Sequence, residues 1–187
     1  MKNKLFIISL LAAGLLQACS SEADRGADST NVLADNGPVA EQSNVSSPAA
    51  TDTAFANKAA ISGMAEVALG KMAAEKGVSA DVKNFGNMMV KDHSMANEEL
   101  MSIAKNKNIM LPTGLDAEHQ AKSDSLSKLN GKAFDEGYIK VMKEGHQKTL
   151  AIMNQEATGG QDSELKAFAA KTAPVVKHHL DELQNIK

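Results

Sequence analysis

The sequence predicts an all-α protein, an antiparallel four-helix bundle, and two features of the chain support this. Aromatic residues make up only 3% of the 187 residues, with no tryptophan and one tyrosine. β-Rich proteins usually carry more aromatic and β-branched side chains. From residue 51 onwards, apolar residues recur every three or four positions, which is the spacing of one face of an α-helix. We therefore expect helices and no strands.

Five helices are predicted from capping residues and helix breakers. A Ser, Thr or Asp before an apolar repeat can accept a hydrogen bond from a free backbone N–H, and glycine commonly ends a helix. The expected N-caps are Asp52 or Thr53, Ser79, Asp116 and Asp162. The first helix is expected to end at Gly77, the second near Lys107, the third near Asn130 and the fourth, from about Ala133, at Gly159. The fifth reaches the C-terminus.

The connections between these helices predict two hairpins. The turns at Gly77 and at Gly159-Gly160 are short, so the helices on either side must run antiparallel. Residues 108–132 are long enough to form a crossover that carries the short third helix. Each long helix has one phenylalanine near its start, and we expect these rings to fill both ends of the core: Phe55, Phe85, Phe134 and Phe168.

The first 18 residues are typical of an export signal. Lys2 and Lys4 precede an apolar run over residues 5–16, which is too short to span a bilayer as a helix. The following tetrad, Leu16-Gln17-Ala18-Cys19, resembles a bacterial lipobox, in which the cysteine is acylated and the chain is cut before it. Stable anchoring takes more than one acyl chain, and lipobox cysteines carry several.

Cys19 is the only cysteine in the chain, so an ordinary secreted protein with an incidental cysteine is the weaker interpretation. Ser20, which is not Asp, resembles signals sorted to the outer membrane. We expect an outer-membrane lipoprotein, on the periplasmic or the surface face, whose partner is the membrane. The formal charge of −3 gives no support for a nucleic-acid partner, and no protein partner is indicated.

Three regions follow from this pattern: a signal peptide over residues 1–18, a disordered tether over 19–50 and a helical domain over 51–187. The tether is rich in Ser, Ala, Asp and Asn, with Pro38 and Pro48 and few large apolar groups. Such a composition cannot bury enough apolar surface to fold.

Polar residues on the apolar faces mark the candidate site. Glu66, His93 and His146 lie about 12–14 residues into their helices and His179 about 17, which is roughly 20–25 Å along each axis. Depths near the middle coincide whichever way a helix runs, so the sequence predicts that these four side chains converge at mid-bundle. Asp92, Asp135 and Tyr138 are predicted to lie around them.

A carboxylate and imidazoles between helices are typical of sites for iron, manganese, zinc or copper. The alternative is a metal-free network, in which Glu66 accepts hydrogen bonds from the histidines and the polar centre only fixes the fold. Methionines near the histidines, such as Met89 and Met142, would suit copper(I), although methionine at helical spacing is usually core. His119 is expected to be solvated, as is one of His178 and His179.

Di-iron bundles carry Glu-x-x-His on two helices. The residues three before His93, His146 and His179 are Val90, Lys143 and Val176, so the motif is absent at all three. We therefore expect a binding protein and not an oxidase, and no catalytic residue is assigned.

Several stretches resemble a family of bacterial exported proteins, domain of unknown function 4142. The matching stretches include Gly63-Met64-Ala65-Glu66, Met89-Val90-Lys91-Asp92-His93, Leu111-Pro112, Phe134-Asp135-Glu136-Gly137-Tyr138 and Ala173-Pro174. The resemblance covers roughly residues 52–184 and implies a ferritin-like bundle in the cell envelope. It implies no reaction. Family members commonly have Leu before the proline, where this chain has Ala173.

Overall fold

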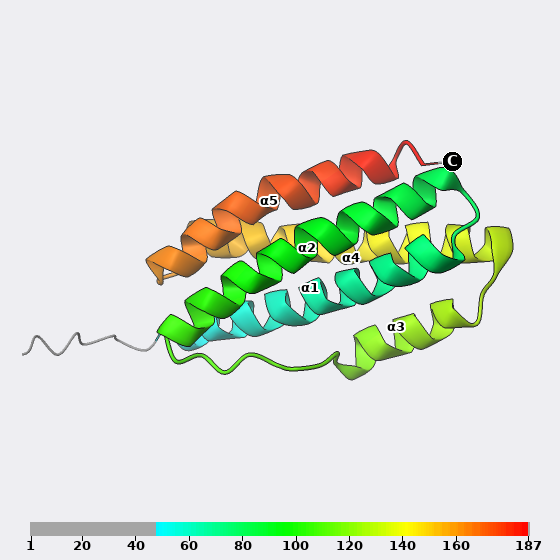
Figure 1. Cartoon of the computed structure of the whole chain (residues 1–187). Coiled ribbons are helices and arrows are strands. Elements are labelled where there is room, and N and C mark those ends of the chain that lie inside the picture. Colours follow the sequence, from blue (N-terminus) through cyan, green and yellow to red (C-terminus); the bar gives the residue numbers. More distant parts are fainter. Residues whose placement is uncertain (1–47, 187) are drawn as a thin grey trace, which may run out of the picture. The chain divides into compact units, whose positions relative to one another are not determined.

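The computed structural model describes residues 48–186, which form five α-helices and no strand. The helices are α1 (Ala50–Lys76), α2 (Ala80–Asn106), α3 (Ala117–Ser127), α4 (Gly131–Gly159) and α5 (Ser163–Leu183). The four long helices lie side by side, and α3 lies beside them in the crossover between α2 and α4 (Figure 1). The predicted all-α class and helical bundle are confirmed. The predicted signal peptide, most of the tether and Cys19 lie outside the described residues.

Three of the predicted N-caps are confirmed. The side chains of Ser79, Asp116 and Asp162 each accept a backbone N–H from the first turn of α2, α3 and α5. The cap predicted for the first helix is wrong. That helix begins at Ala50, before Asp52 and Thr53, and Ala49 at its N-cap provides no side-chain hydrogen bond. Asp52 lies inside α1, and its carboxylate accepts backbone hydrogen bonds at the start of α5.

Two buried carboxylates tie the hairpins to each other. Asp52 of α1 accepts backbone hydrogen bonds from Gln161 (3.1 Å) and Asp162 (2.6 Å), in the turn that precedes α5. At the other end of the bundle, Asp135 of α4 accepts them from Val78 (3.1 Å) and Ser79 (2.8 Å), in the turn that precedes α2. Each carboxylate thus lies at the N-terminus of a helix in the other hairpin, where the helix dipole favours negative charge.

These two ties show that the hairpins repeat one another at a spacing of 83 residues. Asp52 and Asp135 are separated by this spacing, and so are the residues whose N–H groups donate to them. Val78 corresponds to Gln161, and Ser79 corresponds to Asp162. Gly77 and Gly160 and Phe85 and Phe168 keep the same spacing. Glu66 accepts a hydrogen bond from Thr149, the residue 83 positions later. Contact between equivalent positions places a pseudo-two-fold axis through the middle of the bundle.

The α1–α2 hairpin is packed closely because two glycines face each other. A Cβ added at Gly70 would lie 2.7 Å from the carbonyl oxygen of Gly86, and a Cβ at Gly86 would lie 2.7 Å from that of Gly70. Only glycine allows the two backbones to approach this far.

The apolar core is divided into two clusters, one toward each end of the bundle. Phe55 and Phe168 meet edge to face at 6.3 Å in one cluster. Phe134 stacks on Tyr138 at 6.1 Å in the other, and Phe85 meets Tyr138 at 6.2 Å. The predicted filling of both ends by phenylalanines is therefore observed, and polar side chains occupy the middle.

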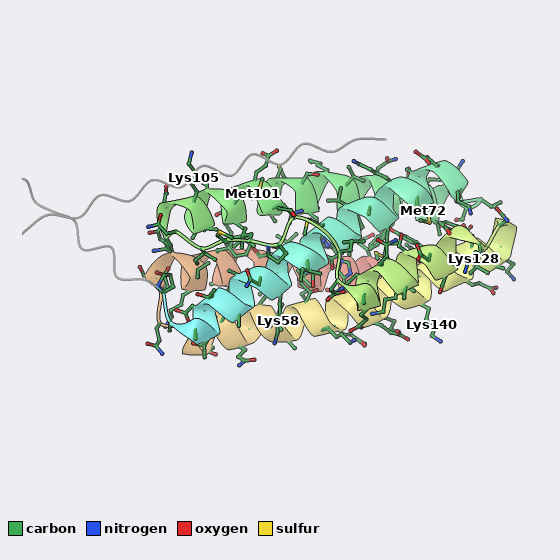
Figure 2. The ribbon with its side chains drawn as sticks, turned by 90° about the horizontal axis from the view of Figure 1, so that it is seen from below. Lys58, Met72, Met101, Lys105, Lys128 and Lys140 are labelled. Carbon is green, nitrogen blue, oxygen red and sulfur yellow. The ribbon has the colours of Figure 1, made fainter. Side chains whose placement is uncertain are left out.

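The short helix α3 lies along α1 and α4 (Figure 2). Leu126, near its C-terminal end, is its one buried residue, and a cavity lies beneath its N-terminal half. Among residues 48–186, no helix has the length and apolar character needed to cross a membrane.

We predict that Asp52→Ala and Asp135→Ala each lower the free energy of unfolding by about 2–4 kcal/mol, because each leaves two backbone N–H groups without their acceptor. Asp→Asn at either position should cost less, since one acceptor oxygen remains. Urea denaturation followed by circular dichroism measures both. If the alanine variants unfold at the wild-type midpoint, the ties do not stabilise the bundle.

Glu156 of α4 gives a pH prediction. Its side chain is 5% exposed, and its Oε1 has no hydrogen-bond partner within residues 48–186. Burial, followed by the charges of Asp52 and Asp162, raises its pKa above the ordinary value of a glutamate. At pH values between the ordinary pKa of an unfolded glutamate and the raised pKa of Glu156, the folded state holds a proton that the unfolded state has lost. The free energy of unfolding therefore falls as pH rises through this range.

Glu156→Gln should therefore raise the melting temperature at pH 7, and the difference from wild type should vanish near pH 4, where about half or more of an unfolded glutamate is protonated. Thermal melts across this range test it. Glu144→Gln, at an exposed position of the same helix, is the control. A gain that persists at low pH would have a cause other than the charge.

Candidate metal centre

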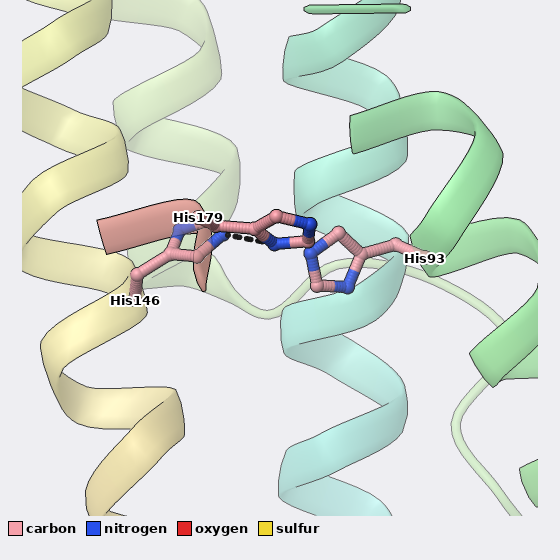
Figure 3. Close-up of side chains that lie close together, drawn as sticks. All are labelled: His93, His146 and His179. Atoms are coloured by element: carbon pink, nitrogen blue, oxygen red, sulfur yellow. Dashed lines mark hydrogen bonds between the residues drawn. The ribbon is translucent and has the colours of Figure 1, made fainter. Parts of the chain in front are cut away.

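Three buried histidines from three helices meet in the middle of the bundle. His93 comes from α2, His146 from α4 and His179 from α5, and their candidate ligand atoms lie within 4.8 Å of one another (Figure 3). His146 and His179 are fully buried and His93 is 4% exposed. Glu66 of α1, also 4% exposed, lies beside them. The structure thus brings together the four side chains that the sequence predicts to converge.

His146 is oriented by its own helix. Its Nδ1 is 2.9 Å from the carbonyl oxygen of Met142, one turn earlier. A carbonyl can only accept, so this nitrogen carries the proton. The other nitrogen, Nε2, therefore presents a lone pair toward the centre of the cluster.

His179 is oriented from the neighbouring helix. Its Nε2 is 3.1 Å from Oδ2 of Asp92, so this nitrogen carries a proton and donates a hydrogen bond to the carboxylate. Its Nδ1 then faces the cluster and lies 3.2 Å from Nε2 of His146 (Figure 3). With both outer nitrogens protonated, two lone pairs face each other at this distance. Neutral imidazoles in these tautomers cannot hydrogen bond to one another.

His93 completes the set. Its Nδ1 is 2.9 Å from Oε2 of Glu66, an ionic contact without the alignment of a hydrogen bond. Its Nε2 is buried and has no hydrogen-bond partner within residues 48–186. All three histidines thus have an oxygen beside one ring nitrogen and leave the other without an acceptor. This is the arrangement in which metal-bound histidines are usually held.

The electrostatics differ among these groups. Burial alone would raise the pKa of Glu66, but His93 and His146 outweigh it and lower the pKa to about 2. Burial alone would lower the pKa of His93, but the Glu66 carboxylate outweighs burial and raises this pKa. Burial lowers the pKa of His146, and lowers that of His179 to about 4. The contact between Glu66 and His93 therefore favours the charged forms of both groups, whereas burial favours the neutral forms of His146 and His179.

The three residues predicted around the site have different positions. Asp92 contacts His179 as described. Asp135 does not belong to the site, because its carboxylate binds the α1–α2 turn at the end of the bundle. Tyr138 packs against Phe85, which itself lies 6.3 Å from the His146 ring, and burial followed by the Glu66 charge raises the pKa of the phenol. His178 is exposed, as predicted for one of the pair with His179, whereas His119 is only partly exposed and pairs with Asp116. Both lie outside the cluster.

Sequence reasoning missed Thr149, whose hydroxyl donates to Oε1 of Glu66 at 3.4 Å. Thr149 follows His146 by three positions, which places both residues on the same face of α4. This spacing could have indicated that its hydroxyl belongs to the central polar group.

Two openings flank the cluster on opposite sides. A cavity of about 490 Å³ lies between α1, α4 and the start of α3, with Glu66, Met142 and Thr149 among its lining residues. A groove of about 520 Å³ lies between α2 and α5, lined in part by Asp92 and His93. Both lie where one hairpin meets the other.

Comparisons with known proteins agree with this fold. The bundle is similar to the crystal structure of a DUF305 fragment from Deinococcus radiodurans, with a TM-score of 0.67 and 11% sequence identity. The similarity covers 74% of this chain and 96% of that one, and at this identity it shows the fold alone. A comparison with curated proteins found no match.

The family resemblance noted in the sequence is confirmed over most of the chain. Residues 37–186 match the family described as "Domain of unknown function (DUF4142)". The match spans the whole bundle and all four central residues, and it carries no assigned activity. The chain therefore belongs to the DUF4142 family.

Proposed function

We propose that this protein is an envelope lipoprotein whose bundle binds one transition metal ion through His93, His146 and His179. The observation that carries the proposal is the 3.2 Å separation between Nε2 of His146 and Nδ1 of His179. Both nitrogens present lone pairs that repel each other, and a cation between them would replace this repulsion with two attractive contacts. Nitrogens about 2.0–2.1 Å from a tetrahedral zinc ion are roughly 3.3 Å apart, which is close to this separation.

The remaining polar atoms also fit a cation. Nε2 of His93 is buried and has no hydrogen-bond partner among the described residues, and a metal ion would bind this nitrogen in place of a proton. Glu66 is 2.9 Å from the opposite nitrogen, where a carboxylate orients a ligating ring and raises its basicity. Three imidazoles with carboxylates nearby suit zinc, copper and iron, and manganese less well because it prefers oxygen ligands.

Binding is favoured over catalysis. No Glu-x-x-His pair is present at the histidines, so the second carboxylate set of a di-iron oxidase is lacking. The alternative function is structural: a metal-free network in which an added proton joins His146 to His179 and the polar centre fixes helix register.

Anchoring is the other half of the proposal and rests on the sequence before residue 48. Cys19 would be acylated and become the first residue of the mature chain, and residues 20–49 would connect it to α1. A bundle on such a connection could sample metal ions close to the membrane surface.

The metal proposal predicts that the purified protein, stripped with a chelator, binds one equivalent of Zn²⁺ or Co²⁺. A metal present at about 100 times its dissociation constant should stabilise the fold by about 2.7 kcal/mol, and chelator should reverse the gain. Metal analysis and thermal melting measure this. Affinity should fall as pH falls, because ligating imidazoles must be deprotonated.

Matched variants assign the site. His179→Gln should lose the bound metal and the gain in melting temperature, whereas His119→Gln, which alters the partly exposed histidine of α3, should retain both. A wild-type protein that binds no metal and melts unchanged in chelator would support the structural alternative. Metal retained by His179→Gln would place the site elsewhere.

The anchoring proposal predicts that Cys19→Ala leaves the protein soluble or unprocessed, since the acylated thiol is lost. Membrane fractionation of cells that express the wild type, Cys19→Ala or Ser21→Ala measures this, with the serine variant as the control. A Cys19→Ala protein that fractionates with the membrane as the wild type does would refute the anchor.

A further inference from the structure

The two openings beside the histidines differ in what lies at their inner ends. The cavity between α1 and α4 meets Glu66, Met142 and Thr149, and none of the three histidines lines it. The groove between α2 and α5 is lined by His93 itself. A cation in this groove could reach a ligand directly, whereas a cation in the cavity would first have to pass the Glu66–Thr149 contact.

Asp92 connects the groove to the cluster. Its side chain is 22% exposed and lines the groove, and its Oδ2 is 3.1 Å from Nε2 of His179. His178, which is exposed, and the thioether of Met95, which is 55% exposed, also line the groove. A carboxylate, an imidazole and a thioether are each ligand types for transition metals.

The charges of the side chains that line the two openings also favour the groove. Glu99 and Lys171 pair with one another in the groove, which leaves Asp92 as the carboxylate there without a lysine partner among the described residues. The cavity is lined by three lysines and three carboxylates, so their formal charges cancel, whereas the two carboxylates of the groove outnumber its one lysine. The cavity residues are Lys58, Lys122 and Lys148 with Glu66, Asp116 and Glu118. Lys58 lies on α1 at this side of the molecule (Figure 2). A net negative opening attracts cations more strongly than one in which lysines balance the carboxylates, so the charges favour the groove.

The backbone of α5 also favours the groove. Pro174 lines it and lies inside the helix. Proline has no N–H to donate to the carbonyl four residues earlier, and its ring crowds that carbonyl, which favours a kink of α5 beside the groove.

We infer that metal ions reach the three-histidine centre through the groove between α2 and α5, and that Asp92 is the residue that receives them. This inference rests on the proposed metal binding. The ion passes from the mouth, near His178 and Met95, to the Asp92 carboxylate and then to His93 and His179. No bond other than metal coordination forms or breaks. Asp92 is thus a positioning residue that both orients His179 and attracts the ion.

A matched pair of bulky substitutions tests the route. Val175→Phe places a ring in the groove, where Val175 is 39% exposed. Gly145→Phe places a ring in the cavity, where no described atom outside the adjacent residues and the nearby backbone of α4 lies within 4 Å of the added Cβ. Stopped-flow absorbance of Co²⁺ uptake by the full chain should show slower association and dissociation for Val175→Phe at an unchanged dissociation constant. Gly145→Phe should bind at the wild-type rate.

A second pair tests the charge. Asp92→Asn keeps an acceptor for His179 but removes the negative charge, and it should slow Co²⁺ association about tenfold, at the low end of known electrostatic effects on association rates. The wild-type rate should fall with added salt, and the rate of the Asp92→Asn variant should be less sensitive to salt. Glu118→Gln makes the same charge change at the cavity and should not slow uptake.

Three results would overturn the inference. Slower uptake in Gly145→Phe with normal uptake in Val175→Phe would assign the route to the cavity. Equal rates in all variants would mean that ions enter through general opening of the bundle. If Asp92→Asn associates with Co²⁺ at the wild-type rate, the charge of Asp92 does not attract the ion. A wild-type protein that binds no Co²⁺ would instead contradict the proposed function, and the two failures are thus distinguishable.

Discussion

A carboxylate and three imidazoles lie buried in the middle of the bundle, and their need for hydrogen-bond and ionic partners constrains the surrounding structure. Burying such groups is costly unless each finds a partner. Met142 and Asp92 satisfy one nitrogen each of His146 and His179, and Glu66 pairs with His93. Asp92 joins α2 to α5, the Glu66–His93 contact joins α1 to α2, and Thr149 joins α4 to α1 through Glu66. The four long helices therefore cannot slide past one another without breaking one of these contacts. The same contacts leave the inner nitrogens free to face one another.

The apolar clusters and the two aspartates hold this centre in register. The aromatic side chains pack toward the two ends of the bundle, which leaves the middle to the polar residues. Asp52 and Asp135 fix the ends by binding the turn of the opposite hairpin. A shift of one hairpin along the other would break both ties and misalign the histidines. Contacts far from the polar centre therefore hold its side chains in place.

Local signals in the sequence were sufficient for the helices and for the meeting of the central residues. Ser79, Asp116 and Asp162 cap helices because a short polar side chain acts on its own first turn. Asp52 and Asp135 were misassigned because their partners lie on another hairpin, and such contacts leave no local pattern. The tautomers of His146 and His179 also depend on tertiary contacts, so whether the centre favours a metal could not be read from spacing.

The 83-residue repeat has a consequence for the composition of the centre. Two identical hairpins joined about a two-fold axis could supply polar groups at that axis only in equal pairs. Here the positions equivalent to His93, His146 and His179 are Val176, Gly63 and Ala96. Because both halves lie in one polypeptide, their sequences can differ, and an odd number of imidazoles meets at a place where exact symmetry would permit only an even number.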